Sequence, residues 1–123
     1  MSNRRILTIE DDPDILAILR IIFQEEGFEF ISNSKGMNVD EIAQVHADLV
    51  LLDVRIVGFE KTGAQLCREL KENAETSNLP VILLSAERDL AQQAEACGAD
   101  HYINKPFDID HVVEIVNQFA LPN

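Results

Sequence analysis

Acidic side chains follow two apolar runs of this sequence, and such residues could bind a cation or act as nucleophiles. Glu10, Asp11 and Asp12 come directly after the first apolar run, and Asp53 directly follows a continuous aliphatic one. Carboxylates that lie close together repel one another and raise their own pKa values unless a cation neutralises them. A small number of hard oxygen ligands, with room left for water, is the coordination that suits Mg²⁺. We therefore expect a magnesium site, provided that the fold brings these acids together.

Two other polar residues end later apolar runs. Ser85 follows the apolar run of residues 81–84, and Lys105 follows a short segment at 102–104. A hydroxyl, an ammonium and a cation beside a carboxylate could neutralise the oxygens of a transferred phosphoryl group. Glu10–Asp12 alone could equally be solvated loop acids, but Asp53 directly follows apolar residues and is expected at the mouth of the core.

The elements that must position these residues are predicted from hydrophobic periodicity. Short apolar runs predict five strands, near residues 6–9, 28–31, 49–52, 81–84 and 102–104. Amphipathic segments between them predict five helices, near residues 13–23, 38–45, 64–70, 88–97 and 108–119. This alternation predicts an α/β fold, a doubly wound parallel sheet of five strands with five helices. In such a sheet the carboxyl ends of the strands share one edge, where ligands bind.

Helix start signals support this assignment. Asp12 is expected to cap the first helix, with Pro13 at its first position, and Asn38 and Glu41 have capping-box spacing for the second. Asp108 is expected to cap the fifth helix. The first helix has an apolar stripe predicted to face the core: Ile15, Leu16, Ile18, Leu19, Ile22 and Phe23.

Composition narrows the class of protein. The 123 residues include 22 Asp plus Glu and 10 Lys plus Arg, a formal net charge of -12, which argues against direct binding to nucleic acid or to an anionic membrane. Cys67 and Cys97 have neither disulfide nor zinc-site spacing. With no signal or membrane-spanning segment in the sequence, we expect a cytoplasmic protein. We expect a single domain over 1–123, with its core at about 4–120 and no output domain.

Four segments together resemble the receiver domain of two-component response regulators over residues 4–120. They are Ile6–Asp14, Ala47–Val54, Pro80–Ala86 and Gly98–Phe107. The resemblance is to stand-alone, chemotaxis-regulator-like receivers, and it implies a flavodoxin-like strand order of 2-1-3-4-5. It also implies a phosphoacceptor switch rather than an enzyme with external substrates, served by a histidine kinase or phosphotransfer protein.

The resemblance implies a role for each site residue. Asp53 would accept the phosphoryl group, while Ser85 and Lys105 would contact its oxygens, and Lys105 would pair with Asp53 beforehand. The expected Mg²⁺ ligands are Glu10, Asp11, Asp53 and the main-chain carbonyl of Arg55. Ser85 and Tyr102 would be the switch residues; the alternative for Tyr102 is a half-buried aromatic that only covers the sheet edge. Their movement would shift the face formed by the fourth helix, fifth strand and fifth helix, which would bind a downstream protein or a second copy of the chain.

Two features concern the rim of the expected site. Arg55 and Glu87 match the positions that tune phosphoryl lifetime, and we hypothesise an ion pair between them that slows dephosphorylation; the alternative is two separately solvated side chains. Val57 replaces the usual proline, and the segment up to Gly63 is about two residues longer than in most receivers. We expect a looser loop there and altered kinase docking. The Lys105–Pro106 bond is expected to be cis by resemblance.

Two other functions are weighed against the phosphoacceptor switch. A degenerate receiver would bind partners without phosphorylation, which the complete set of acids, hydroxyl and lysine disfavours. A magnesium-dependent phosphatase of the haloacid-dehalogenase type would carry a second Asp two residues after its nucleophile. That position is Arg55 here.

Overall fold

A computed structural model describes residues 4–120 of the chain. The end of the chain at 121–123, where the sequence predicts that the last helix has stopped, lies outside the described residues, as do residues 1–3. The strands are β1 (Arg5–Ile9), β2 (Glu29–Asn33), β3 (Leu49–Asp53), β4 (Val81–Ser85) and β5 (His101–Asn104). The helices are α1 (Pro13–Glu25), α2 (Val39–Val45), α3 (Gly63–Glu72), α4 (Leu90–Cys97) and α5 (Ile109–Ala120).

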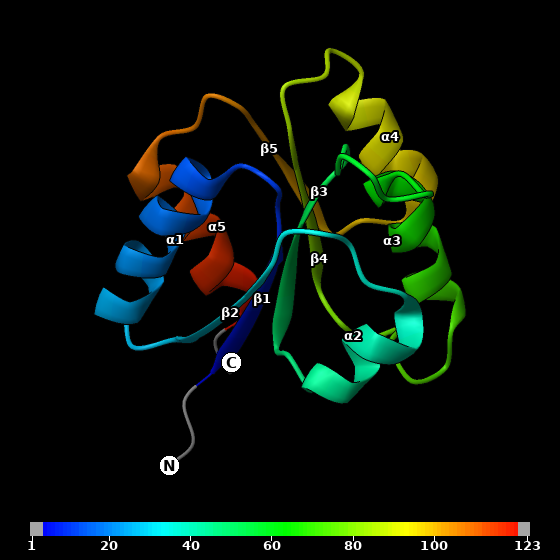
Figure 1. Ribbon diagram of the computed structural model, residues 1–123, viewed down its shortest axis with the longest axis horizontal. Helices are drawn as coiled ribbons and strands as arrows, with labels where there is room; N and C mark the ends of the chain where they lie inside the picture. Colours follow the sequence, from blue (N-terminus) through cyan, green and yellow to red (C-terminus); the bar gives the residue numbers. More distant parts are fainter. Residues whose placement is uncertain (1–3, 121–123) are drawn as a thin grey trace.

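The five strands form one sheet in the order β2-β1-β3-β4-β5, and each neighbouring pair is parallel. Helices α1 and α5 lie on one side of this sheet, and α2, α3 and α4 lie on the other (Figure 1). The predicted doubly wound fold and strand order are confirmed. Because all strands run the same way, the residues that follow them gather at one edge of the sheet.

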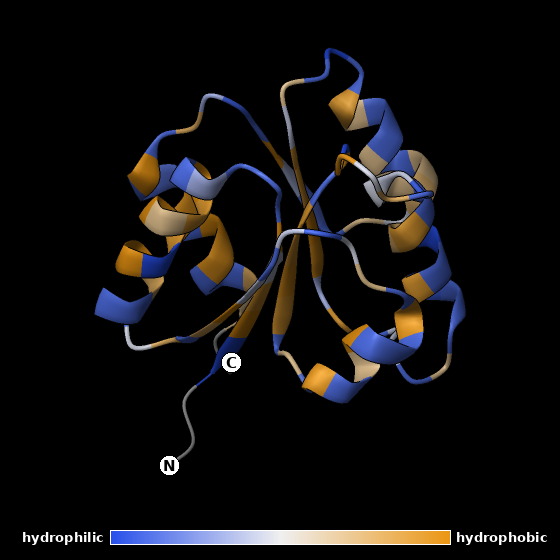
Figure 2. Ribbon diagram, viewed as in Figure 1, coloured by the Kyte–Doolittle hydropathy of each residue, from blue (hydrophilic) through white to orange (hydrophobic). Residues whose placement is uncertain are grey.

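The core consists of two apolar layers, one on each face of the sheet. Side chains of a strand point alternately to opposite faces, so Val50 and Leu52 pack with α2, α3 and α4, while Leu49 and Leu51 pack in the α1 and α5 layer. Every residue of β3 and β4 is buried. Figure 2 shows these central strands in the orange of hydrophobic residues. The continuous apolar runs therefore follow from a sheet that is covered on both faces.

Capping residues fix where the helices begin. The Asp12 carboxylate accepts hydrogen bonds from the main-chain N–H groups of Asp14 and Ile15, so α1 begins directly after the acidic run. The expected capping box between Asn38 and Glu41 is present at α2. The Asp108 carboxylate accepts a bond of 3.0 Å from the N–H of Asp110 at the start of α5. These caps help to fix the positions of the loops around the sheet edge.

Some predicted boundaries and the predicted burial of Ile18 are wrong. Strand β2 runs two residues beyond Ile31, and α4 begins at Leu90 instead of Arg88. Ile18 is 42% exposed, although it belongs to the apolar stripe predicted for α1. A helix that packs on a sheet buries a limited face, here centred on Leu19 and Phe23, so a stripe of six apolar residues is wider than the contact.

Among residues 4–120, none of the helices has both the length and the apolar character needed to cross a lipid bilayer.

Candidate functional site

Four strand ends bring the predicted site residues to one edge of the sheet. Glu10 follows β1, Asp53 is the last residue of β3, Ser85 is the last residue of β4, and Lys105 follows β5. The strand register places Asp53 beside Leu84, next to Ser85. Spacings of dozens of residues along the chain thus become contacts between neighbouring strands.

Three carboxylates form a cluster at this edge. Glu10, Asp11 and Asp53 each offer an oxygen, and these oxygens lie within 4.8 Å of one another. Over residues 4–120 no other group of acidic, His or Cys side chains meets this spacing. Glu10 is fully buried and Asp53 is only 5% exposed, so water cannot fully screen their charges. Compact oxygen donors of this kind fit Mg²⁺.

The Lys105 ammonium lies between two of these acids. Its Nζ atom donates hydrogen bonds to Oε1 of Glu10 and, over 3.2 Å, to Oδ2 of Asp53. Burial works to lower the pKa of Lys105, but its hydrogen bond to Glu10 and the charges of both carboxylates outweigh burial and raise it. Lys105 is therefore an internal counterion for the acids. The bond that follows it, Lys105–Pro106, is cis, as the resemblance implies.

Burial strongly perturbs the Glu10 carboxyl. The pKa of this carboxyl is raised to about 7, mainly by desolvation and then by a hydrogen bond with the Asp53 side chain. Lys105 acts in the opposite direction and lowers the pKa. Without a bound cation the pocket thus holds a proton over much of the range below neutral pH. A divalent ion at the three oxygens would displace that proton.

The hydroxyl of Ser85 lies at the buried mouth of the pocket. Its Oγ atom accepts a hydrogen bond of 3.1 Å from the main-chain N–H of Glu87. A hydroxyl can accept and donate at once, so its own proton stays available for an oxygen in the pocket. The loop after β4 is thereby joined to the side chain that ends the strand.

Main-chain N–H groups of the loop after β3 hold two of the acids. The N–H of Val57 donates to Oδ2 of Asp11 over 2.8 Å, and the N–H of Arg55 donates to Oδ1 of Asp53 over 3.2 Å. The loop therefore follows the rim of the acid cluster closely, although the Val57 side chain is 85% exposed.

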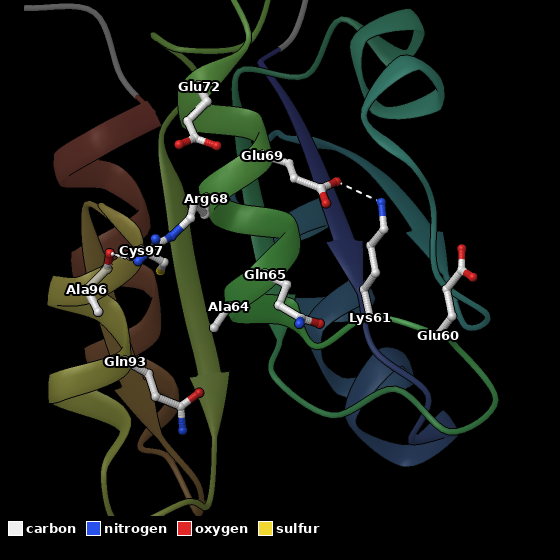
Figure 3. A pocket seen from close by; sticks show the side chains of 10 residues that line it. All are labelled: Glu60, Lys61, Ala64, Gln65, Arg68, Glu69, Glu72, Gln93, Ala96 and Cys97. Atoms are coloured by element: carbon white, nitrogen blue, oxygen red, sulfur yellow. Dashed lines mark hydrogen bonds and ion pairs between the residues drawn. The ribbon is translucent and has the colours of Figure 1, made fainter.

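Residues 59–61 of this loop have anchors of their own. The ring of Phe59 lies against Gly36, where an added Cβ would lie 2.4 Å from the ring carbons. Lys61 reaches forward to α3, where its ammonium lies 2.7 Å from the Glu69 carboxylate (Figure 3). The loop that has Val57 in place of the usual proline therefore packs onto the β2–α2 connection and onto α3.

Gly63 allows α3 to begin directly against the end of β3. Its N–H donates to the carbonyl of Val54 over 2.7 Å, and a Cβ at this position would lie 2.2 Å from the carbonyl oxygen of Asp53. Any larger residue would push either α3 or the end of β3 out of place. The preceding Thr62 forms a capping box with Gln65, which the T-x-x-Q spacing could have revealed.

At the rim of the pocket, an ion pair joins the loops that follow Asp53 and Ser85. Arg55 Nε donates to Oε1 of Glu87, as the sequence-based hypothesis requires, although the effect of the pair on phosphoryl lifetime stays a prediction. The other oxygen of Glu87 accepts from Gln93 of α4 over 2.6 Å. The hydrogen bond from Gln93, followed in importance by the one from Arg55, lowers the pKa of Glu87. Gln93 was not identified from the sequence.

Tyr102, the expected switch residue, is half-buried on β5. Its ring packs against the apolar layer that includes α4, and its main-chain N–H donates to Nδ1 of His101 over 2.8 Å. It therefore lies outside the acid pocket, on the face formed by α4 and β5. Its role in switching stays a prediction.

A sequence model of the response regulator receiver domain matches residues 6–117. The chain is 32% identical over 122 residues to the sporulation initiation phosphotransferase F of Bacillus subtilis, covering 97% of this chain and 95% of that protein. Several other curated relatives are longer, and the chain spans 24% of the Escherichia coli regulatory protein AtoC.

Solved structures share the fold. The receiver domain of a Pseudomonas aeruginosa PAO1 sensor histidine kinase, solved with a magnesium ion in its active site cleft, superposes with a TM-score of 0.82 at 21% identity, covering 97% of this chain and 98% of that one. The Vibrio cholerae chemotaxis protein CheY4 gives a TM-score of 0.83 at 18% identity, covering 96% and 99%.

Proposed function

Because this chain belongs to the response regulator receiver domain family, we propose that it is a phosphoacceptor switch of a two-component phosphorelay in which Asp53 receives the phosphoryl group. The observation that supports Asp53 most directly is its set of contacts. It is the carboxylate that ends a central strand, lies among the other two acids and accepts a hydrogen bond from Lys105. The donor would be a histidine kinase or a phosphotransfer protein.

The transfer requires an in-line nucleophile and neutralised phosphoryl oxygens. An oxygen of Asp53 forms the new O–P bond while the P–N bond of the phosphohistidine breaks, and the electron pair of that bond stays on the imidazole nitrogen. Lys105, 3.2 Å from Asp53, can turn its ammonium to one phosphoryl oxygen, and the Ser85 hydroxyl can donate to another.

Glu10, Asp11, Asp53 and the carbonyl of Arg55 would hold Mg²⁺, which supplies positive charge to the phosphoryl oxygens when bound. The resulting acyl phosphate is open to attack by water in the same pocket. The domain thus catalyses its own phosphorylation and dephosphorylation and does not process external substrates.

The output surface would be the face of α4, β5 and α5. A phosphoryl group adds about -1.5 to -2 charges at Asp53. Movement of Ser85 toward it would break the hydrogen bond to the N–H of Glu87, shift the loop that leads into α4, and make room for the Tyr102 ring. The shifted face would bind a downstream protein or a second copy of the chain. No observation favours a receiver that works without phosphorylation.

The test is phosphorylation by acetyl phosphate, followed by intact-mass spectrometry and peptide mapping. The wild type is expected to gain one phosphoryl group with Mg²⁺ and none with a chelator. Asp53→Asn should gain none, while Asp14→Asn, which removes an exposed carboxylate of α1, should behave as the wild type. A wild-type protein that stays unmodified, or a label retained in Asp53→Asn, would refute the proposal.

A further inference from the structure

The first turns of α4 are bound to the rim of the acid pocket through one carboxamide. Gln93 donates from its Nε2 atom to Oε2 of Glu87 over 2.6 Å and to Oδ1 of Asp89 over 2.8 Å. A carboxamide nitrogen carries two protons, so both of its donors are used. Gln93 projects from α4 and lines the groove between α3 and α4, where Figure 3 labels it.

Glu87 connects α4 to the loop after β3. Its carboxylate has one oxygen on Gln93 and the other on Arg55, and its main-chain N–H donates to the Ser85 hydroxyl. A single residue thus joins the loop after β3, the end of β4 and the helix α4. Movement of any one of these three elements would disturb the contacts of Glu87 with the other two.

The ion pair needs such support because it is open to solvent. The Arg55 side chain is 82% exposed, and an exposed pair gains little while it loses side-chain freedom. The Glu87 side chain is 21% exposed and is already held by Gln93, so less freedom remains to be lost when Arg55 binds. Gln93 therefore favours the paired state without contacting Arg55.

Asp89 shows that the start of α4 is organised around this contact. It is the N-cap residue of α4, yet its side chain makes no capping hydrogen bond, and its backbone (φ -96°, ψ 24°) is not extended as most N-caps are. Its carboxylate accepts from Gln93 instead. The first turn of α4 is thus held through Gln93 rather than by its own cap.

We propose that Gln93 is a positioning residue that holds the Arg55–Glu87 ion pair across the phosphoacceptor pocket and couples the lifetime of the phosphoryl group to the position of α4. This inference rests on the proposed function. A partner that displaces the first turn of α4 would loosen Glu87 and expose the acyl phosphate to water. Binding at the output face would then speed dephosphorylation.

The experiment measures the decay of phosphorylated protein in Mg²⁺ after removal of acetyl phosphate. Gln93→Ala removes the hydrogen bond that holds Glu87 and is expected to shorten the half-life about threefold. Gln92→Ala, a neighbouring glutamine that is exposed on the same helix, serves as the matched control and should decay as the wild type. Gln93→Lys, which keeps a donor for both carboxylates, should restore most of the half-life.

A double-mutant cycle with Glu87→Ala tests whether Gln93 acts through Glu87. The double variant should decay no faster than Glu87→Ala alone. Additive effects, or an unchanged half-life in Gln93→Ala, would overturn the inference while leaving the proposed function intact, because each sample is first checked for uptake of the phosphoryl group at Asp53.

A second readout does not need phosphorylation. The Nε–H signal of Arg55 in the unphosphorylated protein reports its bond to Glu87, and in Gln93→Ala it should move toward the position of a solvated arginine and exchange faster with water. An Arg55 signal that is the same in Gln93→Ala and in Gln92→Ala would contradict the inference even if the chain accepted no phosphoryl group.

Discussion

Raising the pH should destabilise the magnesium-free protein, and Glu10 should be the cause. Burial and Asp53 raise the pKa of Glu10 to about 7 in the folded protein, whereas the carboxyl of the unfolded chain keeps its ordinary value of 4.5. Between these two values the folded protein holds a proton that the unfolded chain has released. The stabilisation is therefore complete at acidic pH and is lost as the pH rises through 7.

The difference between the two pKa values corresponds to on the order of 3 kcal/mol in the free energy of unfolding. The assay is urea unfolding in a chelator, followed by circular dichroism, at intervals from about pH 5 to about pH 8. Glu10→Gln keeps the shape of the side chain and its acceptor oxygen for Lys105 but does not titrate. Between about pH 5 and about pH 8, the free energy of unfolding of Glu10→Gln should therefore fall by about 3 kcal/mol less than that of the wild type.

Magnesium should reverse the trend. A cation at the three carboxylates favours their ionised forms, so saturating Mg²⁺ should restore most of the stability that the wild type loses near pH 8 and should do little for Glu10→Gln. Glu25→Gln, an exposed substitution at the far end of α1, should follow the wild type at every pH. Equal pH slopes in wild type and Glu10→Gln would refute the assignment of the buried proton to Glu10.

Three further predictions concern other parts of the site. Lys105→Met should lower the free energy of unfolding of the magnesium-free protein by about 3 kcal/mol, because it removes the ammonium that neutralises the buried acids; urea unfolding measures this, and a stability equal to wild type would contradict the counterion role. Gly63→Ala should cost about 2 kcal/mol and slow phosphoryl uptake, because its methyl group would overlap the carbonyl of Asp53; unchanged stability and uptake rate would disprove this packing constraint. Arg55→Ala and Glu87→Ala should leave the urea midpoint unchanged and shorten the phosphoryl half-life about threefold, to a similar extent. Unchanged half-lives in both variants would end the tuning hypothesis.

The sheet edge could be predicted from sequence because parallel topology alone determines it. Once the apolar runs were identified as strands, Glu10 and Asp53 had to meet at the carboxyl ends, whatever the loops between them did. Parallel topology alone could not predict the contact of Lys105 with Asp53, because that contact depends on how the chain turns after β5. The expectation came from the family resemblance. The structure has the same contact at 3.2 Å.

Contacts between loops could not be predicted in this way. Gln93 meets Glu87 because the connection before α4 bends back toward the helix, and no hydrophobic period records that bend. The packing of Phe59 on Gly36 joins two loops of irregular shape. Ile18 was misplaced for another reason: apolar spacing gives the centre of a buried helix face but not its width.

The position of Lys105 has a consequence for a cell in which magnesium levels vary. Without a metal ion the acids still have a positive charge beside them, because the Lys105 ammonium donates hydrogen bonds to Glu10 and Asp53. This internal counterion offsets part of the repulsion between the acids when no metal ion is bound. Under the proposed function, phosphoryl transfer would depend on the supply of Mg²⁺ as well as on the supply of phosphodonor, because Lys105 would have to share Glu10 and Asp53 with the ion.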